Sequence, residues 1–414
     1  MKRKLIEWTL FAIIAAGAVL LVRRFVPWAI LRYYHPNADA ARVFLRQRLR
    51  DEERKLSTNR PSVQPGKSGL EPCLVIPAPL GVGARAGSQQ SGSVRDCLDL
   101  IPGGPPTNAV EFDLRSGSVI LVQTDMYLPG HPPITFTRVI EPLRNWNLRF
   151  QVFLPNEYDA FPSGDRFPFT FQKLQLADRQ QVLFRRISKG TGYAHAVYEQ
   201  TETISAFYHA IDGWNGNGWD VDLADGRTLV FPASYYAKRP QQGALTALRG
   251  PSGAELRLSR DSDGNLHWVA SSNGRWMKLG YEGSAIVSLS SSNGEKAAYA
   301  YDKRNLLSSS TNADGQKLSY KYDKWGELLA VTNAKSHAVL VSANYDARTM
   351  IASLRVAGAG NYRVEYRRDP MSHQVEIYVS SGRGEVWTLT FGKCTDTRCM
   401  YEVKNHQVAK MPLT

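Results

Sequence analysis

The sequence predicts a mainly β protein, built from short antiparallel strands that follow a single transmembrane helix. Three observations predict it: an apolar run near the start, alternating apolar and polar residues from about Val110 onward, and a glycine-to-tyrosine frame repeated within residues 246–370. Of the 414 residues, 43% are hydrophobic, so the chain can bury a substantial core. This composition excludes a globally disordered protein.

The apolar run is Leu5–Val22, which contains one charged residue, Glu7. As a helix it spans about 27 Å, just sufficient for the hydrocarbon core of a bilayer. The small-residue triplet Ala16–Ala18 lies inside the run, which disfavours cleavage as a signal peptide. We expect residues 1–34 to be an uncleaved single-pass anchor that contacts the membrane through residues 5–22. A cleaved signal peptide and a buried soluble helix are the alternatives.

Charge and cysteines bear on the compartment. Residues 1–60 carry a net charge of +8 out of +13, so the body has no strongly basic groove and we expect no nucleic-acid partner. Basic residues flank the apolar run on both sides and lean slightly towards a cytoplasmic body. Disulfides would favour a periplasmic or extracellular body, which we expect, with cytosolic thiols as the alternative. The candidate disulfide residues are Cys73, Cys97, Cys394 and Cys399.

The chain divides by composition into further segments. Residues 35–56 are rich in helix formers and predict a juxtamembrane helix, whereas residues 57–107 are rich in Pro, Gly and Ser and predict an irregular linker. Strand patterns then predict a β module at 108–245, a repeat array at 246–370 and further strands at 371–414.

The repeat array has a regular frame. Four turn glycines, Gly253, Gly274, Gly294 and Gly315, are spaced by 21, 20 and 21 residues, and a Tyr-Asp pair or a variant of it follows seven and eight residues after each. Arg260 takes the tyrosine position in the first unit, and looser copies follow the fourth. The remaining motif residues are Asp261, Tyr281, Tyr301, Asp302, Tyr322, Asp323, Tyr345 and Asp346.

Strand geometry explains this frame. Alternation places Leu318, Tyr320 and Tyr322 on one apolar face of a strand, and Lys317, Ser319 and Lys321 on the other, wet face. The Asn-Gly and Asp-Gly pairs predict tight hairpin turns with positive φ at both central residues. In the second turn of each unit, the aspartate can accept hydrogen bonds from backbone amides ahead of it. Stacked units would form a continuous meander with packed tyrosines.

These motifs resemble the RHS/YD-repeat family, whose units have the form Gly-x6-Tyr-Asp-x2-Gly-x-Leu. Residues 112–145 are similar to the leader module of RHS proteins, with landmarks at Ser116-Gly117, Thr124-Asp125 and Thr137-Arg138. The resemblance implies an antiparallel leader module at 108–245 followed by YD-type hairpins.

RHS toxins carry many more repeats, which close a hollow shell, and then a core segment beginning Asp-Pro-x-Gly-Leu ahead of a toxin domain. At the corresponding place this sequence has Asp369-Pro370-Met371-Ser372, without the Gly-Leu continuation. We therefore expect a short array that forms a partial shell, without the core segment or a toxin domain.

A non-enzymatic binding or scaffold surface of the cell envelope is the function that we expect. The resemblance implies carbohydrate binding, for which Trp268, Trp276 and Trp325 are candidate stacking residues; packing within hairpins is the alternative for each ring. A shortened or orphan component of a polymorphic toxin or secretion system is the alternative function.

An enzyme is the third hypothesis. The histidines have no metal-ligand spacing, and neither a Gly-x-Ser-x-Gly elbow nor a P-loop occurs. His195 and His209 lie close to Glu199 and Glu202 in sequence, but polar residues in turns explain them equally well. We therefore expect no catalysis, no metal and no cofactor.

Overall fold

The computed structural model describes residues 72–82, 93–96, 101–113, 117–140, 156–164, 168–177, 181–201, 206–346, 350–368, 375–395 and 398–407. The expected anchor at 5–22 and the expected helix at 35–56 lie outside these ranges. Within them, no helix is long and apolar enough to cross a membrane. The described residues are mainly β, as predicted. Their helical elements are three 3-10 turns, η2 (Glu157–Asp159), η3 (Tyr193–His195) and η4 (Pro240–Gly243).

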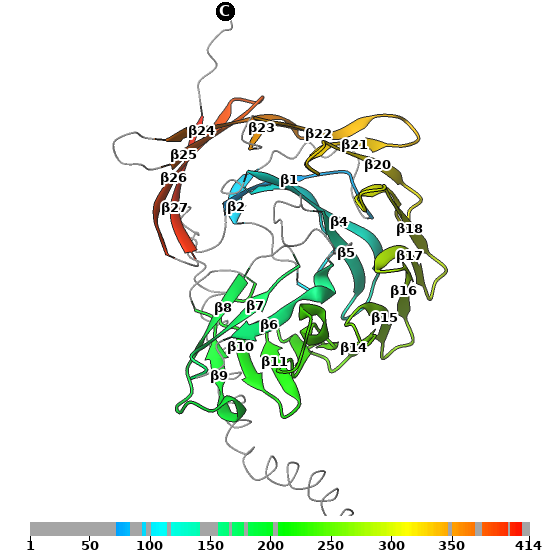
Figure 1. The fold of residues 1–414 in the computed structure, drawn as a ribbon, viewed down its shortest axis with the longest axis vertical. Helices are drawn as coiled ribbons and strands as arrows, with labels where there is room; N and C mark the ends of the chain where they lie inside the picture. The colour runs from blue at the N-terminus through cyan, green and yellow to red at the C-terminus, as the bar shows by residue number, and fades with distance from the viewer. Residues whose placement is uncertain are drawn as a thin grey trace, which may run out of the picture.

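Five antiparallel strands form a separate sheet, the inner sheet, which lies inside the curve of the remaining strands (Figure 1). Its order is β2-β1-β3-β4-β5. The strands are β1 (Pro72–Pro77), β2 (Ser93–Asp96), β3 (Asn108–Asp113), β4 (Ser118–Leu128) and β5 (Ile134–Ile140).

The linker expectation for residues 57–107 is wrong for β1 and β2. β1 forms because Leu74, Val75 and Ile76 make a short apolar run that pairs with β3 and is buried. A run of three apolar residues among Pro, Gly and Ser is too short to predict a strand. It becomes a strand because it pairs with a segment that follows later in the chain.

The other strands form one closed sheet, the shell, in which each strand is followed by its neighbour in sequence and β27 lies next to β6. The strands before the repeats are β6 (Phe161–Gly164), β7 (Phe171–Gln175), β8 (Gln181–Arg186), β9 (Val197–Glu199), β10 (Ile211–Trp214), β11 (Gly218–Asp222) and β12 (Thr228–Pro232).

The repeat region contributes the largest part of the shell. Its strands are β13 (Ala247–Arg249), β14 (Glu255–Arg260), β15 (Leu266–Ser271), β16 (Trp276–Glu282), β17 (Ala285–Ser291), β18 (Lys296–Tyr301), β19 (Leu307–Thr311), β20 (Lys317–Tyr322), β21 (Leu328–Asn333), β22 (Val339–Tyr345), β23 (Ile351–Val356) and β24 (Gly360–Arg368). The last strands are β25 (Val375–Ser381), β26 (Glu385–Thr395) and β27 (Arg398–Gln407).

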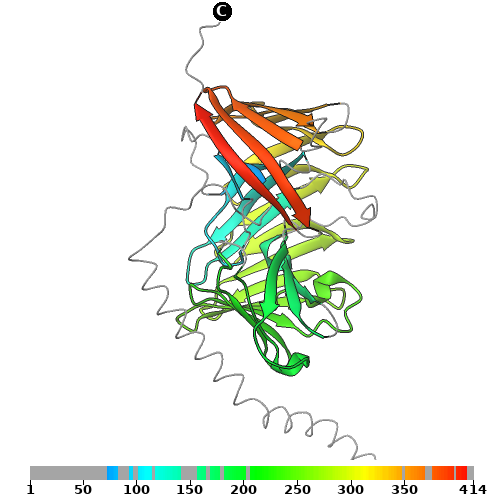
Figure 2. The ribbon, with the colours of Figure 1, turned by 90° about the vertical axis from the view of Figure 1, so that its left-hand side faces the viewer.

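Closure of the shell corrects the expectation of a partial shell. The repeats form a wide arc in Figure 1, and β25–β27 with β6–β11 complete the circle. Figure 2 shows the long strands β26 and β27 on the side that closes it. Counting repeats alone underestimates the circumference, because neighbouring strands add about 4.8 Å each wherever they come from in the chain. The expected leader module at 108–245 is accordingly shared: β3–β5 lie in the inner sheet, and β6–β12 in the shell.

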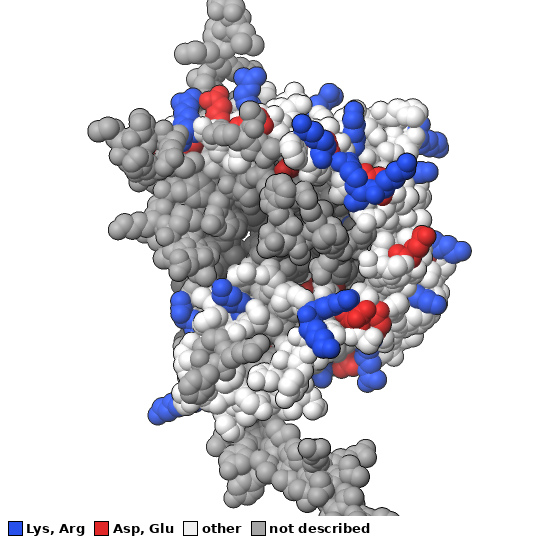
Figure 3. All heavy atoms as spheres, viewed as in Figure 1, with Lys and Arg blue, Asp and Glu red and all other residues white. Residues whose placement is uncertain are grey.

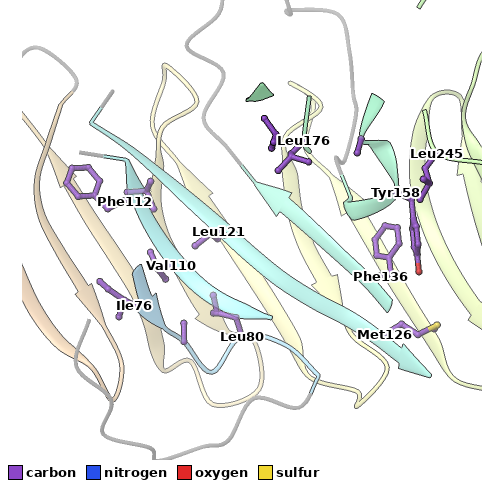
Figure 4. Close-up of a cluster of buried hydrophobic side chains, with 14 of the residues drawn as sticks. Ile76, Leu80, Val110, Phe112, Leu121, Met126, Phe136, Tyr158, Leu176 and Leu245 are labelled. Carbon is purple, nitrogen blue, oxygen red and sulfur yellow. The ribbon is translucent and has the colours of Figure 1, made fainter. Parts of the chain in front are cut away.

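The main core lies between one face of the inner sheet and the inner face of the shell (Figure 4). Phe112, Leu121 and Phe136 of the inner sheet belong to the same buried cluster as Leu318 and Leu354 of the repeats. A smaller cluster on the opposite face of the inner sheet contains Ile120, Val122 and Val139. The inner sheet therefore occupies the concave side of the repeats.

The predicted faces of the repeat strands are confirmed. Leu318 and Tyr320 of β20 are buried on the core side, and Tyr322 is half-buried beside them. Lys317 and Lys321 on the other face are exposed. The same alternation gives β18 its burial pattern, since period 2 forces one face inward wherever a core covers it.

The turn type differs from the prediction. Gly274, Gly294 and Gly315 have φ of 86°, 85° and 76°, but Asn273, Asn293 and Asp314 are not among the residues with positive φ. In the first of these loops the Gly274 amide donates to the Ser271 carbonyl (3.1 Å), and the Ser271 amide donates to the Arg275 carbonyl (2.8 Å). This is a three-residue loop, a type I turn closed by one left-handed residue, rather than a two-residue turn.

Candidate functional site

A buried polar cluster joins the inner sheet to the repeats, at two of the positions that resemble RHS landmarks. We call it the junction cluster. It consists of Gln123, Asp125, Arg138, Tyr299, Ser310 and Tyr320, all of which are buried.

The inner sheet supplies a buried ion pair. Gln123 of β4 lies opposite Arg138 of β5, and the register shifts between Thr124 and Met126, so that Asp125 is an extra, bulged residue. The Asp125 carboxylate accepts a hydrogen bond from Arg138 Nε and another from Gln123 Nε2 (2.9 Å). Alternation puts Gln123 and Asp125 on the same face of β4 as Leu121, and the bulge returns Met126 to this face as well.

The repeats supply hydroxyl groups to this pair. The Tyr299 hydroxyl of β18 donates to Asp125 Oδ2 (2.8 Å), and Arg138 Nη2 donates to the Tyr320 hydroxyl of β20 (2.5 Å) and to Ser310 Oγ (3.0 Å). The Arg138 guanidinium also lies 5.3 Å from the centre of the Tyr320 ring. These tyrosines stand two residues before the Tyr-Asp pairs, so the repeat frame places them on the inner face.

The electrostatics of the junction cluster favour a charged Arg138 beside neutral phenols. Burial by itself lowers the pKa of Arg138, but the Asp125 carboxylate and the oxygens of Tyr320 and Tyr299 raise it above its ordinary value. Burial raises the pKa of both tyrosines, which therefore keep their protons. Arg138 Nη1 has no hydrogen-bond partner among the described residues.

This arrangement stabilises contact between two sheets. The Asp125 and Arg138 side chains are fully buried, so a solute does not reach them, and the charges are compensated by each other and by four polar neighbours. The junction cluster therefore fixes the register of the inner sheet against the repeats.

A second contact joins η2 to the first repeat. Arg260, which takes the tyrosine position of that unit, donates to the Tyr158 carbonyl (2.5 Å), to Asp159 Oδ1 (3.2 Å) and to the Leu245 carbonyl (3.1 Å). Glu157 beside them accepts a hydrogen bond from the Thr137 amide of β5 (2.6 Å). Burial raises the pKa of Glu157 to about 7, and also raises the pKa of Asp159.

A third contact is made at the tip of the β4–β5 hairpin. Arg275, in the loop between β15 and β16, donates to the carbonyls of Leu128 (3.0 Å), Pro129 and Pro132 (3.1 Å). Further along the shell, Gln316 Nε2 donates to the Pro79 carbonyl (3.1 Å). Loops on one edge of the repeats thus hold the edge of the inner sheet.

Three of the motif tyrosines connect their repeat to the preceding one. The Tyr281 hydroxyl donates to the Leu266 carbonyl (2.7 Å), the Tyr301 hydroxyl to Ile286 (2.7 Å) and the Tyr345 hydroxyl to Leu328 (2.9 Å). Each accepting residue is at or next to the start of the preceding strand. The ring of each half-buried tyrosine therefore packs in the core, while its hydroxyl donates a hydrogen bond. Tyrosine suits such a position because it combines an apolar ring with a polar end.

The motif aspartates close turns, as predicted. Asp302 Oδ1 accepts from the amides of Arg304 (2.8 Å) and Leu306 (2.9 Å). Equivalent bonds are made by Asp261, Asp323 and Asp346. The fourth residue of these loops is left-handed, as at Gly264, Asn305 and Gly326. Gly253 has the corresponding place in the loop after β13.

Two of the three candidate stacking tryptophans lie together. The rings of Trp268 and Trp276 are half-buried and stacked, with centroids 4.7 Å apart and planes at 19°. Trp325 lies in the turn after β20, is 60% exposed, and has Lys324 Nζ 4.9 Å from its ring centre. Trp325 is thus the most accessible of the three.

The cysteines are only partly within the described residues. The register of β26 and β27 places the backbones of Cys394 and Cys399 opposite each other, whereas Cys97 lies outside the described ranges. The disulfides remain predictions.

One of the two candidate histidines, His209, pairs with a carboxylate. His209 Nδ1 lies 2.8 Å from Glu199 Oε1 in a half-buried pair, and His209 has a φ of 60°. Within the described residues, no group of three or more His, Cys, Asp or Glu side chains could hold a metal ion.

Sequence reasoning missed most of the residues that join the sheets. In the sequence, Thr124-Asp125 and Thr137-Arg138 stand out only as landmarks of the resemblance, and no motif marks Glu157 or Arg275. One signal was available: Arg260 replaces tyrosine in a repeat position, which indicates a local partner of different chemistry.

Comparison with known proteins found one matching family model. Residues 221–411 match the Teneurin YD-shell model. No curated protein matches the sequence.

The solved structures that this chain matches include toxin complexes. A crystal structure of TcdB2-TccC3 without its hypervariable C-terminal region is 14% identical, with a TM-score of 0.30, over 72% of this chain and 20% of that chain. A structure of the Photorhabdus luminescens Tc holotoxin pore is 9% identical, with a TM-score of 0.26, over 69% and 20%. This chain therefore spans about a fifth of the length of the chains that it matches.

Proposed function

Because this chain is a member of the RHS/YD-repeat family, we propose that it is a non-enzymatic binding or scaffold shell of the cell envelope, held at a membrane by residues 5–22. The observation that carries the proposal is the junction cluster. It holds the inner sheet against the concave side of the repeats, where the main core forms. The outer face of the shell is therefore the surface that partners contact.

The outer face of the repeats supports a binding role. It presents Lys278, Lys296, Lys317 and Lys321 among short side chains such as Ser319. Figure 3 shows Lys and Arg side chains projecting around the edge of the molecule, together with acidic ones. Short residues between long cations leave a shallow surface on which a polar partner can lie.

Carbohydrate is the class of partner that we propose for this face. The half-buried rings of Trp268 and Trp276 stack on each other, and Trp325 is exposed beside Lys324, so aromatic rings of the kind that pack against sugars lie at two places in the repeats. A glycan screen of the full-length protein in detergent tests this, with Trp276→Ala and Trp325→Ala as variants. Binding that survives both substitutions, or no binding to any glycan, contradicts the proposal.

Membrane anchoring and the side of the membrane have their own test. Protease treatment of intact cells should degrade the body if it is exported and leave it whole if it faces the cytosol. Recovery of the whole chain in the soluble fraction would refute the anchor.

A component of a toxin or secretion system is the second candidate. Closure of the shell favours it, because a closed sheet of this kind can form one part of a larger hollow assembly. Native mass spectrometry of the detergent-extracted protein would reveal a tightly bound second polypeptide, which the scaffold proposal does not require.

A further inference from the structure

Exposed apolar side chains gather at one end of the strands that precede the repeats. Within the described residues six large apolar side chains are exposed, and four of them are Ile187, Tyr193, Tyr235 and Tyr236. We call these four the aromatic rim. The other two, Trp325 and Val339, lie in the repeats. Clustering of this kind marks an interaction surface, whereas single exposed apolar residues do not.

Strand directions place the aromatic rim on one edge. The loop from β8 to β9 carries Ile187 and Tyr193, and the loop after β12 carries Tyr235 and Tyr236. Since β8 to β12 are successive antiparallel strands, these two loops and the β10–β11 turn lie at the same strand ends (Figure 1).

Contacts tie the three loops together. The Tyr193 ring lies 5.1 Å from the Trp214 ring at the end of β10, in an edge-to-face arrangement. The Ala233 amide donates to the Asn217 carbonyl (2.9 Å), which joins the loop after β12 to the β10–β11 turn. Tyr235 and Tyr236 also pack edge to face, with ring centres 4.8 Å apart.

The charges around the aromatic rim are basic. Lys189, Lys238 and Arg239 are exposed in the same loops, and residues 187–195 and 233–242 contain no Asp or Glu. Arg239 Nη1 lies 3.4 Å from Oδ2 of Asp263, whose side chain is half-exposed. Amphipathic rings beside flexible cations fit the headgroup region of a bilayer, where rings bury their apolar part and cations meet phosphates.

We propose that the aromatic rim docks on an anionic lipid surface and thereby orients the shell on the membrane. The inference rests on the proposed anchor at residues 5–22, because that anchor keeps the body close to a bilayer. Residues 23–71 between the anchor and β1 are long enough for these loops to reach the headgroups.

Hydrogen exchange of the full-length protein tests this proposal. The protein is placed in vesicles of phosphatidylcholine, in vesicles that also contain phosphatidylglycerol, and in detergent. Amides of residues 187–193 and 233–239 should exchange more slowly in the anionic vesicles than in the other two. Because each basic residue near an anionic surface contributes about fivefold to binding, Lys238→Ser should reduce that difference by about fivefold.

Two variants distinguish the aromatic rim from the anchor. Tyr235→Ser/Tyr236→Ser should still sediment with vesicles through residues 5–22 but lose the slowing of exchange. The matched control Trp325→Ser removes an exposed aromatic ring in the repeats and should keep it. Equal exchange in all three environments, equal slowing in neutral and anionic vesicles, or failure of the unmodified chain to sediment with vesicles overturns the proposal.

Discussion

At the residue scale, buried ion pairs determine how the inner sheet and η2 pack against the repeats. Arg138 and Asp125 are fully buried and compensated from both sheets, so either partner alone would be a buried charge without its counter-ion. Arg260 and Asp159 form a similar, almost completely buried pair between η2 and the first repeat. Such pairs specify register, because a shifted register would leave charges uncompensated.

We predict that Arg138→Met destabilises the protein by about 3–5 kcal/mol, because Asp125 would remain buried without its cation. Unfolding of the full-length protein in detergent, followed by tryptophan fluorescence against urea concentration, measures this. The double variant Arg138→Met/Asp125→Leu should lose less than the two single variants together. Arg367→Met, which breaks an exposed pair with Glu365, is the control and should change little. A loss for Arg138→Met no greater than that control would show that the junction cluster does not hold the sheets.

Glu157 makes stability depend on pH. Burial raises its pKa from an ordinary value of 4.5 to about 7, so between these values the folded state holds a proton that the unfolded state has lost. Stability from this group therefore falls by about 3 kcal/mol as pH rises through that window, and stays constant above it. Urea unfolding at pH 5 and pH 8 should show a smaller difference for Glu157→Gln than for the unmodified protein. An unchanged difference would mean that Glu157 is ionised throughout.

At the element scale, one kind of loop joins most repeat strands. The glycine loops and the aspartate loops both place a left-handed residue fourth, and Asn305 shows that asparagine can take this place. The apolar side chains of two neighbouring strands must point to the same inner face. The loop between the strands must therefore keep their residues in register. Asp302 and its equivalents stabilise the return by accepting two amides.

We predict that Gly274→Ala costs about 1–2 kcal/mol, the cost of a left-handed alanine, because an added Cβ would have no atom within 4 Å. Gly264→Ala should cost more, since its Cβ would lie 2.4 Å from the backbone carbonyl carbon of Gln241 in η4. Thermal unfolding of the two variants gives the comparison, and Asn305→Gly should be close to neutral. Equal losses at the two glycines would contradict the packing of η4 on this loop.

At the scale of the whole molecule, the inner sheet and the shell are held by contacts that are distant in sequence. The Arg275 side chain and the carbonyls of the β4–β5 tip are separated by more than 140 residues. Such contacts determine how the inner sheet is seated, whereas each hairpin forms locally.

We predict that Arg275→Met loosens the β4–β5 tip without unfolding the shell. Amides near Leu128 and Ile134 should exchange faster with solvent, while those of β20 keep their rates. Gly130→Ala should have the same effect, because its Cβ would lie 2.1 Å from the Arg275 guanidinium and displace it. Arg304→Met, which removes a donor to the Asp323 carbonyl within the repeats, should leave the tip unchanged. Unaltered exchange at the tip in both test variants would show that Arg275 does not hold the β4–β5 tip.

The local architecture was accessible from the sequence, and the long-range architecture was not. Strand faces, the turn role of Asp302 and the packed tyrosines follow from period-2 alternation and short-range turn chemistry, which act over fewer than ten residues. The sequence predicts two-residue turns where the structure has three-residue loops, because an Asn-Gly pair suits both and strand register decides between them. The strand β1 was missed because its pairing partner lies outside any local window.

Alternation and turn residues alone are enough to predict a repeated hairpin with one apolar face, and to predict packing for the motif tyrosines and turn closure for the motif aspartates. Closure of the sheet, the inner sheet on its concave side, and the contact of Arg138 with Tyr320, 182 residues away in sequence, become visible in the folded chain alone. The physical reason is that alternation specifies which side of a strand is apolar, but not what covers it. The cover is selected by burial and charge compensation over the whole chain.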